Sequence, residues 1–249
     1  SLDESKRNLL YSRITRRMRD LGIDRFEEYF SLVEAAGDQQ EMSFFISLLT
    51  TNVTSFFREI HHFDLLRKLL ATNLLSETKI RIWSAGCSTG QEAYSIAYVL
   101  NELMVDFPTL EFEILATDID EAVLSKARDG NYAKCEVVGL SADKKEKMFY
   151  REKHESGMLE VRQGLKDLIT FRCVNLVDMA DSRNCFDYIF CRNVVIYFDR
   201  ETQSRLWCDF HRRLNAGGVM FLGQAERLSG GVELDFDRIG QTTFRKKIH

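Results

Sequence analysis

A glycine turn between a strand pattern and a helix pattern is the stretch of the sequence best suited to hold a ligand. Residues 81–100, RIWSAGCSTGQEAYSIAYVL, begin as a buried strand, cross Gly86 and Gly90, and continue with the apolar spacing of a helix. Glycine at such a turn lets the backbone pass close to an anion or a nucleotide. The next strand pattern, EFEILATDID, ends near Asp118, whose carboxylate could accept hydrogen bonds from a ribose diol.

The spacing of the two glycines narrows the class of ligand. A phosphate-binding P-loop needs GxxxxGK[ST], and this turn has no lysine. A dinucleotide site prefers GxGxxG, whereas Gly86 and Gly90 are spaced GxxxG. The pattern therefore favours a nucleoside without a pyrophosphate, and a glycine turn followed by an acid-ended strand is the general arrangement of S-adenosylmethionine (SAM) methyltransferases. The alternative, a turn that only packs the helix on the strand, stays open.

Missing motifs exclude several substrates and ligands. Enzymes that methylate exocyclic base amines carry an Asn/Asp-Pro-Pro-aromatic motif, whereas the corresponding position here reads CRNVVIYF. Methylation at C5 of a base uses a Pro-Cys nucleophile, but Cys191 follows a phenylalanine, and the one proline of the chain is Pro108. His61 and His62 are adjacent and the six cysteines form no CxxC pair. We therefore expect neither a nucleic-acid substrate nor a metal site.

Five motifs together resemble those of the CheR family. They are TNVTSFFRE (51–59), RIWSAGCSTGQEAYSIA (81–97), LATDID (115–120), FDYIFCRNVVIYFD (186–199) and GGVMFLGQAERL (217–228). Members of this family are chemotaxis methyltransferases, which use SAM to methylate glutamate side chains of chemoreceptors, and the resemblance covers nearly the whole chain. The sequence departs from the family at Gln91 and Ala93, where GEEPYS is common, and at Gln224 and Ala225, where a His-Ser pair is common.

The resemblance implies a set of site residues. The cofactor contacts it implies are Asn52, Thr54, Arg58, Glu92, Asp118, Asn175, Leu176, Arg192 and Asn193. The glycine turn adds Gly86. Asp118 is also predicted without the resemblance, because it ends a strand where its carboxylate could accept hydrogen bonds from a ribose. Tyr197 and Arg58 are the candidates for holding the acceptor carboxylate. The alternatives are local: Asn52 and Thr54 could cap a helix end, and Tyr197 could be a packed aromatic residue.

The implied reaction is an in-line displacement, in which a carboxylate attacks the methyl group on a cationic sulfur and S-adenosylhomocysteine leaves. A glutamate with a pKa of about 4.3 is already ionised at neutral pH, so no general base is required. Two other functions remain open at this point. One is a binding module that keeps SAM but has lost turnover, and the other is a methyltransferase of small-molecule carboxylates.

The helix and strand patterns around these residues predict an α/β protein with an N-terminal helical domain. Residues 1–75 read as helices, and residues 76–249 alternate strands with helices, which is typical of a parallel sheet. We expect a Rossmann-like SAM-dependent methyltransferase domain there. Residues of about 145–168 fit the alternation poorly and predict a small antiparallel β insert with its turn at Ser156 and Gly157. The C-terminal run predicts a further antiparallel hairpin at the sheet edge.

Charge and composition bear on partners and location. The net charge is −4, and no apolar run approaches the roughly 18 residues that span a bilayer. We expect a cytoplasmic monomer that does not insert into membranes and acts on the cytoplasmic helical region of membrane chemoreceptors. Residues 1–20 nevertheless carry six basic side chains against three acidic ones, and Lys6, Arg13 and Arg17 share one helix face. This face is either a docking surface for an acidic receptor helix or simply solvated.

Overall fold

A seven-stranded sheet forms the centre of the computed structural model, which describes residues 4–35, 39–50, 52–73, 79–107, 109–150, 157–179 and 185–248. Its order is β5-β2-β1-β6-β7-β9-β8. The strands are β1 (Lys79–Ala85), β2 (Glu111–Asp118), β5 (Ile169–Cys173), β6 (Phe186–Cys191), β7 (Leu214–Leu222), β8 (Phe236–Gly240) and β9 (Thr243–Lys246). The first five pair in parallel, and β9 and β8 add an antiparallel hairpin at the edge. The predicted α/β class and the C-terminal hairpin are confirmed.

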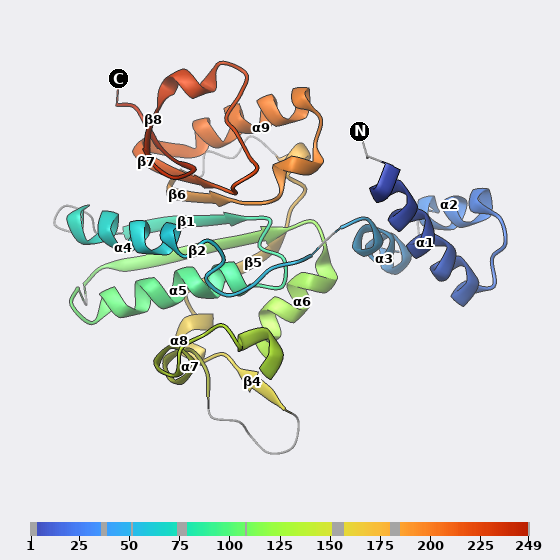
Figure 1. The fold of residues 1–249 in the computed structure, drawn as a ribbon, viewed down its shortest axis with the longest axis horizontal. Coiled ribbons are helices and arrows are strands. Elements are labelled where there is room, and N and C mark those ends of the chain that lie inside the picture. The colour runs from blue at the N-terminus through green and yellow to red at the C-terminus, as the bar shows by residue number, and fades with distance from the viewer. Residues whose placement is uncertain are drawn as a thin grey trace.

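Helices cover both faces of the sheet (Figure 1). On one face, α4 (His61–Asn73) and α5 (Gln91–Met104) share a core with Ile82 and Phe190. On the other, α9 (Arg200–Arg213) packs on Trp83 and Ile189. Side chains alternate between the two faces because successive strand residues point to opposite sides. The order of the strands reverses between β1 and β6, and ligands of open α/β sheets bind at the carboxyl ends beside such a reversal.

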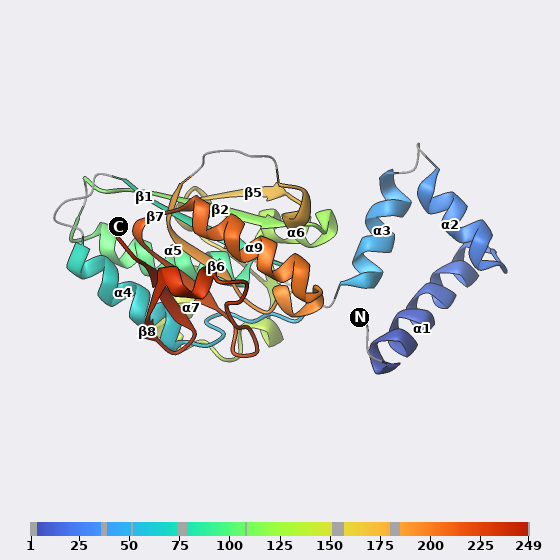
Figure 2. The ribbon, with the colours of Figure 1, turned by 90° about the horizontal axis from the view of Figure 1, so that it is seen from above.

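Three helices stand apart from the sheet at the N-terminal side (Figures 1 and 2). They are α1 (Glu4–Leu21), α2 (Phe26–Glu34) and α3 (Gln39–Leu49), and Ile14, Met18, Tyr29 and Val33 form their own core. The fourth predicted helix, α4, lies instead against α5 in the core of the α/β body. The apolar face of α4 therefore packs against the sheet and α5 rather than against the N-terminal bundle. The boundary predicted near residue 75 falls beside residues 74–78, which lie outside the described residues.

A short antiparallel pair lies below the sheet in Figure 1, in the region of the predicted insert. Here β4 (Met158–Glu160) pairs with β3 (Asn131–Ala133), and Phe149 forms a single bridge to Val161. The antiparallel element is confirmed, but its partner strand precedes the predicted segment, and residues up to Met148 are helical. The predicted turn at Ser156 cannot be compared, because residues 151–156 lie outside the described residues.

The remaining short elements connect the main ones. They are α6 (Glu121–Asp129), α7 (Ala142–Met148), α8 (Gln163–Lys166) and the 3-10 turns η1 (Lys134–Val137), η2 (Leu176–Asp178), η3 (Val195–Tyr197) and η4 (Val232–Asp235). Over the described residues, every helix is too short or too polar to cross a bilayer.

Candidate functional site

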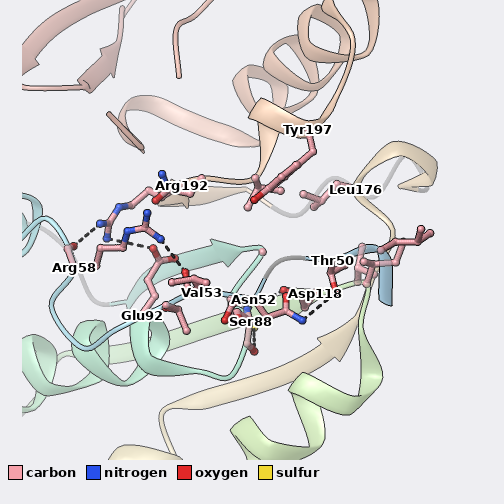
Figure 3. A pocket seen from close by; sticks show the side chains of 18 of the residues that line it. Thr50, Asn52, Val53, Arg58, Ser88, Glu92, Asp118, Leu176, Arg192 and Tyr197 are labelled. Atoms are coloured by element: carbon pink, nitrogen blue, oxygen red, sulfur yellow. Dashed lines mark hydrogen bonds and ion pairs between the residues drawn. The ribbon is translucent and has the colours of Figure 1, made fainter. Parts of the chain in front are cut away.

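A cavity of about 290 Å³ opens at the carboxyl ends of the central strands. Its walls come from the linker after α3, the glycine turn, the ends of β2 and β5, and the loop after β6 (Figure 3). The predicted cofactor and catalytic residues all line it: Asn52, Thr54, Arg58, Gly86, Glu92, Asp118, Asn175, Leu176, Arg192, Asn193 and Tyr197. Arg13 and Arg17 do not. Residues as far apart in the sequence as Asn52 and Tyr197 thus share one pocket.

The glycine turn is fixed to β2 by backbone hydrogen bonds. The amides of Gly86 and Cys87 both donate to the carbonyl of Thr117, at 2.7 and 2.9 Å. Gly86 has a φ of 83°, in the left-handed region, and a side chain at this position would collide with Val194 in the loop after β6. The turn therefore needs glycine both for its conformation and for its close approach to the opposite wall of the pocket.

Asp118 is the acid at the end of β2 and is only 9% exposed. One carboxylate oxygen accepts from the amide of Ser88 at 2.8 Å, and the other accepts from the amide of Asp120 at 3.1 Å. Burial raises the pKa of this carboxyl group, and the two amides oppose that rise. Each oxygen still has a second lone pair, so Asp118 can hold the glycine turn and accept from a ligand in the pocket.

Asp120, two residues later, joins the linker to the α/β body. It is fully buried and caps α6 by accepting from the amide of Ala122 at 3.0 Å. The same carboxylate accepts from the hydroxyls of Ser47 and Thr50 at 2.8 and 3.2 Å, and from the side-chain amide of Asn52 at 3.1 Å. The NH₂ group of Asn52 therefore donates its hydrogen bonds to other groups of the protein, Thr50 and Asp120. Sequence reasoning missed Asp120, although its place just before a helix marks it as an N-cap.

Arg192, the first residue after β6, lies in a buried ionic cluster with a side chain only 2% exposed. Its Nη1 is 3.3 Å from Oε2 of Glu92, and its Nη2 donates to the backbone carbonyl of Arg58. Oε2 of Glu59 lies 3.6 Å from Nη2. Phe57 and Glu59 both have left-handed φ angles, 53° and 56°. Arg192 thus holds a strained turn in place from the opposite side of the pocket.

Glu92 and Arg58 complete this end of the pocket. Glu92 accepts from the hydroxyl of Ser84 at 2.6 Å, and burial raises the pKa of its carboxyl group despite the nearby Arg192. The side chain of Arg58 is half-buried and donates from Nη1 to the carbonyl of Val53 at 2.9 Å. Its planar guanidinium carries five N–H donors, which leaves it capable of binding a carboxylate in the pocket.

Tyr197 reaches into the pocket from the loop after β6, across from Asn52 and Asp118 (Figure 3). It ends the turn η3 and is 47% exposed. On the adjoining wall, Asn175 caps η2 by accepting from the amide of Val177 at 3.1 Å, and Leu176 is buried. Polar groups that could bind a nucleoside therefore face a phenol that could meet an acceptor.

Glu59, His61 and His62 place one potential ligand atom each within 4.8 Å of one another, a grouping that the sequence analysis did not anticipate. The Glu59 carboxylate already lies 3.6 Å from the guanidinium of Arg192, a permanent positive charge that opposes a metal ion. His62 is fully buried, and its Nε2 lies 3.1 Å from the carbonyl of Gln241. Burial and the charge of Arg192 lower the pKa of His62 to about 3.

Arg13 and Arg17 lie within the helical bundle, where both have partners. Nη1 of Arg13 donates to the carbonyls of Leu48 and Thr50, both at 3.0 Å. Arg17 forms an ion pair with the buried Glu41 at 2.5 Å. These contacts give both side chains a role in the packing of the bundle, and docking onto a receptor stays a prediction.

Comparison with known proteins identifies similar chains over nearly the full length. The CheR methyltransferase SAM binding domain matches residues 52–245, and the CheR methyltransferase all-alpha domain matches residues 1–50. A Rhizobium etli protein named "Probable chemotaxis protein methyltransferase" is 41% identical, over 98% of this chain and 93% of its own. Chemotaxis protein methyltransferases of Salmonella typhimurium and Escherichia coli are 40% and 39% identical, over 98% of this chain and 83% and 84% of theirs.

Proposed function

The chain belongs to the CheR methyltransferase family, and we propose that it transfers the methyl group of SAM to glutamate side chains of chemoreceptors. The products are glutamate methyl esters and S-adenosylhomocysteine. The observation that carries this proposal is the single pocket lined by all the predicted cofactor and catalytic residues.

The nucleoside of the cofactor fits the wall formed by β1, β2 and the linker. The glycine turn at Gly86 allows close approach of the ligand, and Asp118 offers acceptors for the ribose hydroxyls. Arg58 offers donors for the carboxylate of the methionine moiety. Held by these residues, SAM would supply its methyl group in the same pocket into which Tyr197 reaches.

The chemistry needs alignment more than proton transfer. The glutamate nucleophile is already an anion at neutral pH, so the protein must align its oxygen with the methyl carbon and the sulfur and displace water from the carboxylate. The hydroxyl of Tyr197 can orient the carboxylate by donating one hydrogen bond without neutralising it. A bidentate arginine would bind the carboxylate more tightly but weaken it as a nucleophile, which favours Arg58 as a cofactor ligand.

We further propose that the enzyme works as a monomer in the cytoplasm, on the helical cytoplasmic region of the receptor. The predicted cofactor and catalytic residues of one chain already meet in one pocket. The half-exposed Tyr197 marks the side from which the receptor glutamate enters.

Methylation of receptor-containing membranes with radiolabelled SAM tests this function. We expect label in the receptor that is released as methanol by mild base, because esters hydrolyse in base and methylated amines do not. Membranes without receptor are the control. SAM binding without transfer would identify a binding module, and base-stable label would exclude carboxyl methylation.

A further inference from the structure

We propose that Glu226 is a positioning residue for methyl transfer: its buried carboxylate fixes the loop after β6 that carries Asn193 and Tyr197. Glu226 lies within the motif GGVMFLGQAERL, but the sequence analysis gave it no role. The proposal rests on the methyltransferase function for its kinetic consequences, while its structural part can be measured without any turnover.

Four backbone amides converge on this carboxylate. Oε1 accepts from the amides of Val194 and Val195, both at 2.9 Å. Oε2 accepts from the amides of Asn193 at 3.0 Å and Gly223 at 2.6 Å. Three consecutive residues of the loop after β6 are therefore tied to a single side chain from the loop after β7.

Because Glu226 is buried, its carboxylate relies on these four amides in place of water. The residue is 3% exposed, and among the described residues no basic side chain forms an ion pair with it. A buried carboxylate is unfavourable unless hydrogen bonds replace its hydration, and clustered backbone amides are suited to this. Removing the acceptor would leave buried N–H groups unsatisfied, which the loop can relieve only by moving.

The loop has a conformation that the chain would not adopt by default. Asn193 has a left-handed φ of 61°. Gly223 lies so close that a Cβ atom there would be 2.8 Å from the amide nitrogen of Asn193 and 2.9 Å from Oε2 of Glu226. The carboxylate and the absence of a side chain at position 223 together fix this conformation.

The position of Tyr197 depends on this backbone. Its side chain is 47% exposed, so packing constrains it less than it would constrain a core residue. The side-chain amide of Gln203 donates to the carbonyls of Val195, at the start of η3, and of Phe198, just after its end, at 3.1 and 2.9 Å. Glu226 thus holds the backbone amides at the start of this turn, and Gln203 holds two of the backbone carbonyls in and after it.

The test compares Glu226→Gln with the exposed control Glu233→Gln in single-turnover methylation at saturating SAM. The amide group of glutamine presents one acceptor and one donor, so two of the four bonds are lost. We expect the rate to fall by about 10- to 100-fold, since displacing a reacting group by about 1 Å can cost 100-fold. Glu233→Gln should react at the parent rate. A parent-like rate for Glu226→Gln would overturn the proposal.

A double-mutant cycle separates positioning from general damage. If Glu226 acts through Tyr197, adding Glu226→Gln to Tyr197→Phe should lower the rate by less than about threefold, because interacting sites are not additive. Full additivity of the two effects would overturn the proposal. Glu226→Asp, which keeps the charge but withdraws it by one methylene, is the second variant if Glu226→Gln does not fold, and the same cycle applies to it.

Hydrogen exchange gives a readout independent of turnover. In Glu226→Gln, the amides of residues 193–195 should lose protection, while those of β1 keep it. Unchanged protection at residues 193–195 would also overturn the proposal. If the parent protein forms no ester, the methyltransferase function fails, yet the exchange experiment still decides whether Glu226 fixes this loop.

Discussion

His62 should make the protein less stable as the pH falls below 6.5. Its ring is fully buried between α4 and the hairpin of β8 and β9, with Nε2 3.1 Å from both the carbonyl of Gln241 and the hydroxyl of Thr242. Burial, and then the positive charge of Arg192, lower the pKa of His62 from 6.5 to about 3. The ring therefore stays neutral in the folded protein over a range in which it is protonated in the unfolded chain.

The size of the effect follows from this difference in pKa. Between pH 6.5 and about 3 the unfolded state binds a proton at this site that the folded state does not bind, so the free energy of unfolding decreases as the pH falls. The limiting slope is about 1.36 kcal/mol per pH unit. At pH 5, one and a half units below the unfolded pKa, the loss relative to pH 8 is about 2 kcal/mol.

Urea unfolding of the parent and of His62→Gln, at pH 8 and pH 5, measures this loss. Between the two pH values the parent should lose about 2 kcal/mol more than the variant, which cannot take up the proton. The comparison cancels carboxyl groups such as Glu92, whose raised pKa acts in the opposite direction in both proteins. His61→Gln, the neighbouring control, should retain the steep dependence of the parent. Parallel curves for the parent and His62→Gln would refute this reasoning.

Three further predictions concern the pocket and the bundle. Tyr197→Phe should slow single-turnover methylation at saturating SAM by about 10- to 150-fold, the loss of one hydrogen bond to a charged group, with SAM affinity from calorimetry unchanged; a rate within about twofold of the parent would leave Tyr197 as a packed aromatic. Asp118→Ala should weaken SAM binding in calorimetry and also lower the free energy of unfolding by about 1–3 kcal/mol, because two buried amides lose their acceptor; unchanged SAM affinity in the folded variant would remove Asp118 from the site. Arg17→Glu should destabilise the bundle by about 3 kcal/mol in thermal melts, since it faces the buried Glu41, whereas the exposed Arg16→Glu should not; equal melting of both variants would refute a structural role for Arg17.

Periodicity in the sequence predicted the sheet and the edge at which the pocket opens. Strand patterns alternating with helix patterns require a parallel sheet, and the carboxyl ends of parallel strands meet at one edge. Gly86 follows β1, Asp118 is the last residue of the neighbouring β2, and both line the pocket. These features were predictable because each depends on a local pattern and on one general rule of topology.

Long-range pairing explains what the sequence did not reveal. Asp118 and Asp120 stand two residues apart in one motif, yet the first holds the glycine turn and the second holds Ser47 and the linker. Similarly, the antiparallel partner of β4 is β3, which precedes the predicted insert. Local composition cannot distinguish such partners, because the choice is made by packing between segments that are distant in the sequence.

The buried charges around the pocket bear on whether the fold catalyses or only binds. Arg192 fixes the turn that carries Arg58, the proposed cofactor ligand, whereas Glu226 fixes the loop that carries Tyr197, the proposed ligand of the acceptor. Burying a charge to hold strained backbone is costly, and retaining SAM needs no such arrangement in the loop that carries Tyr197. Orientation within a fraction of an ångström matters most where an oxygen must meet a methyl group in line. The restraint on the Tyr197 side therefore favours a catalyst over a module that only retains SAM.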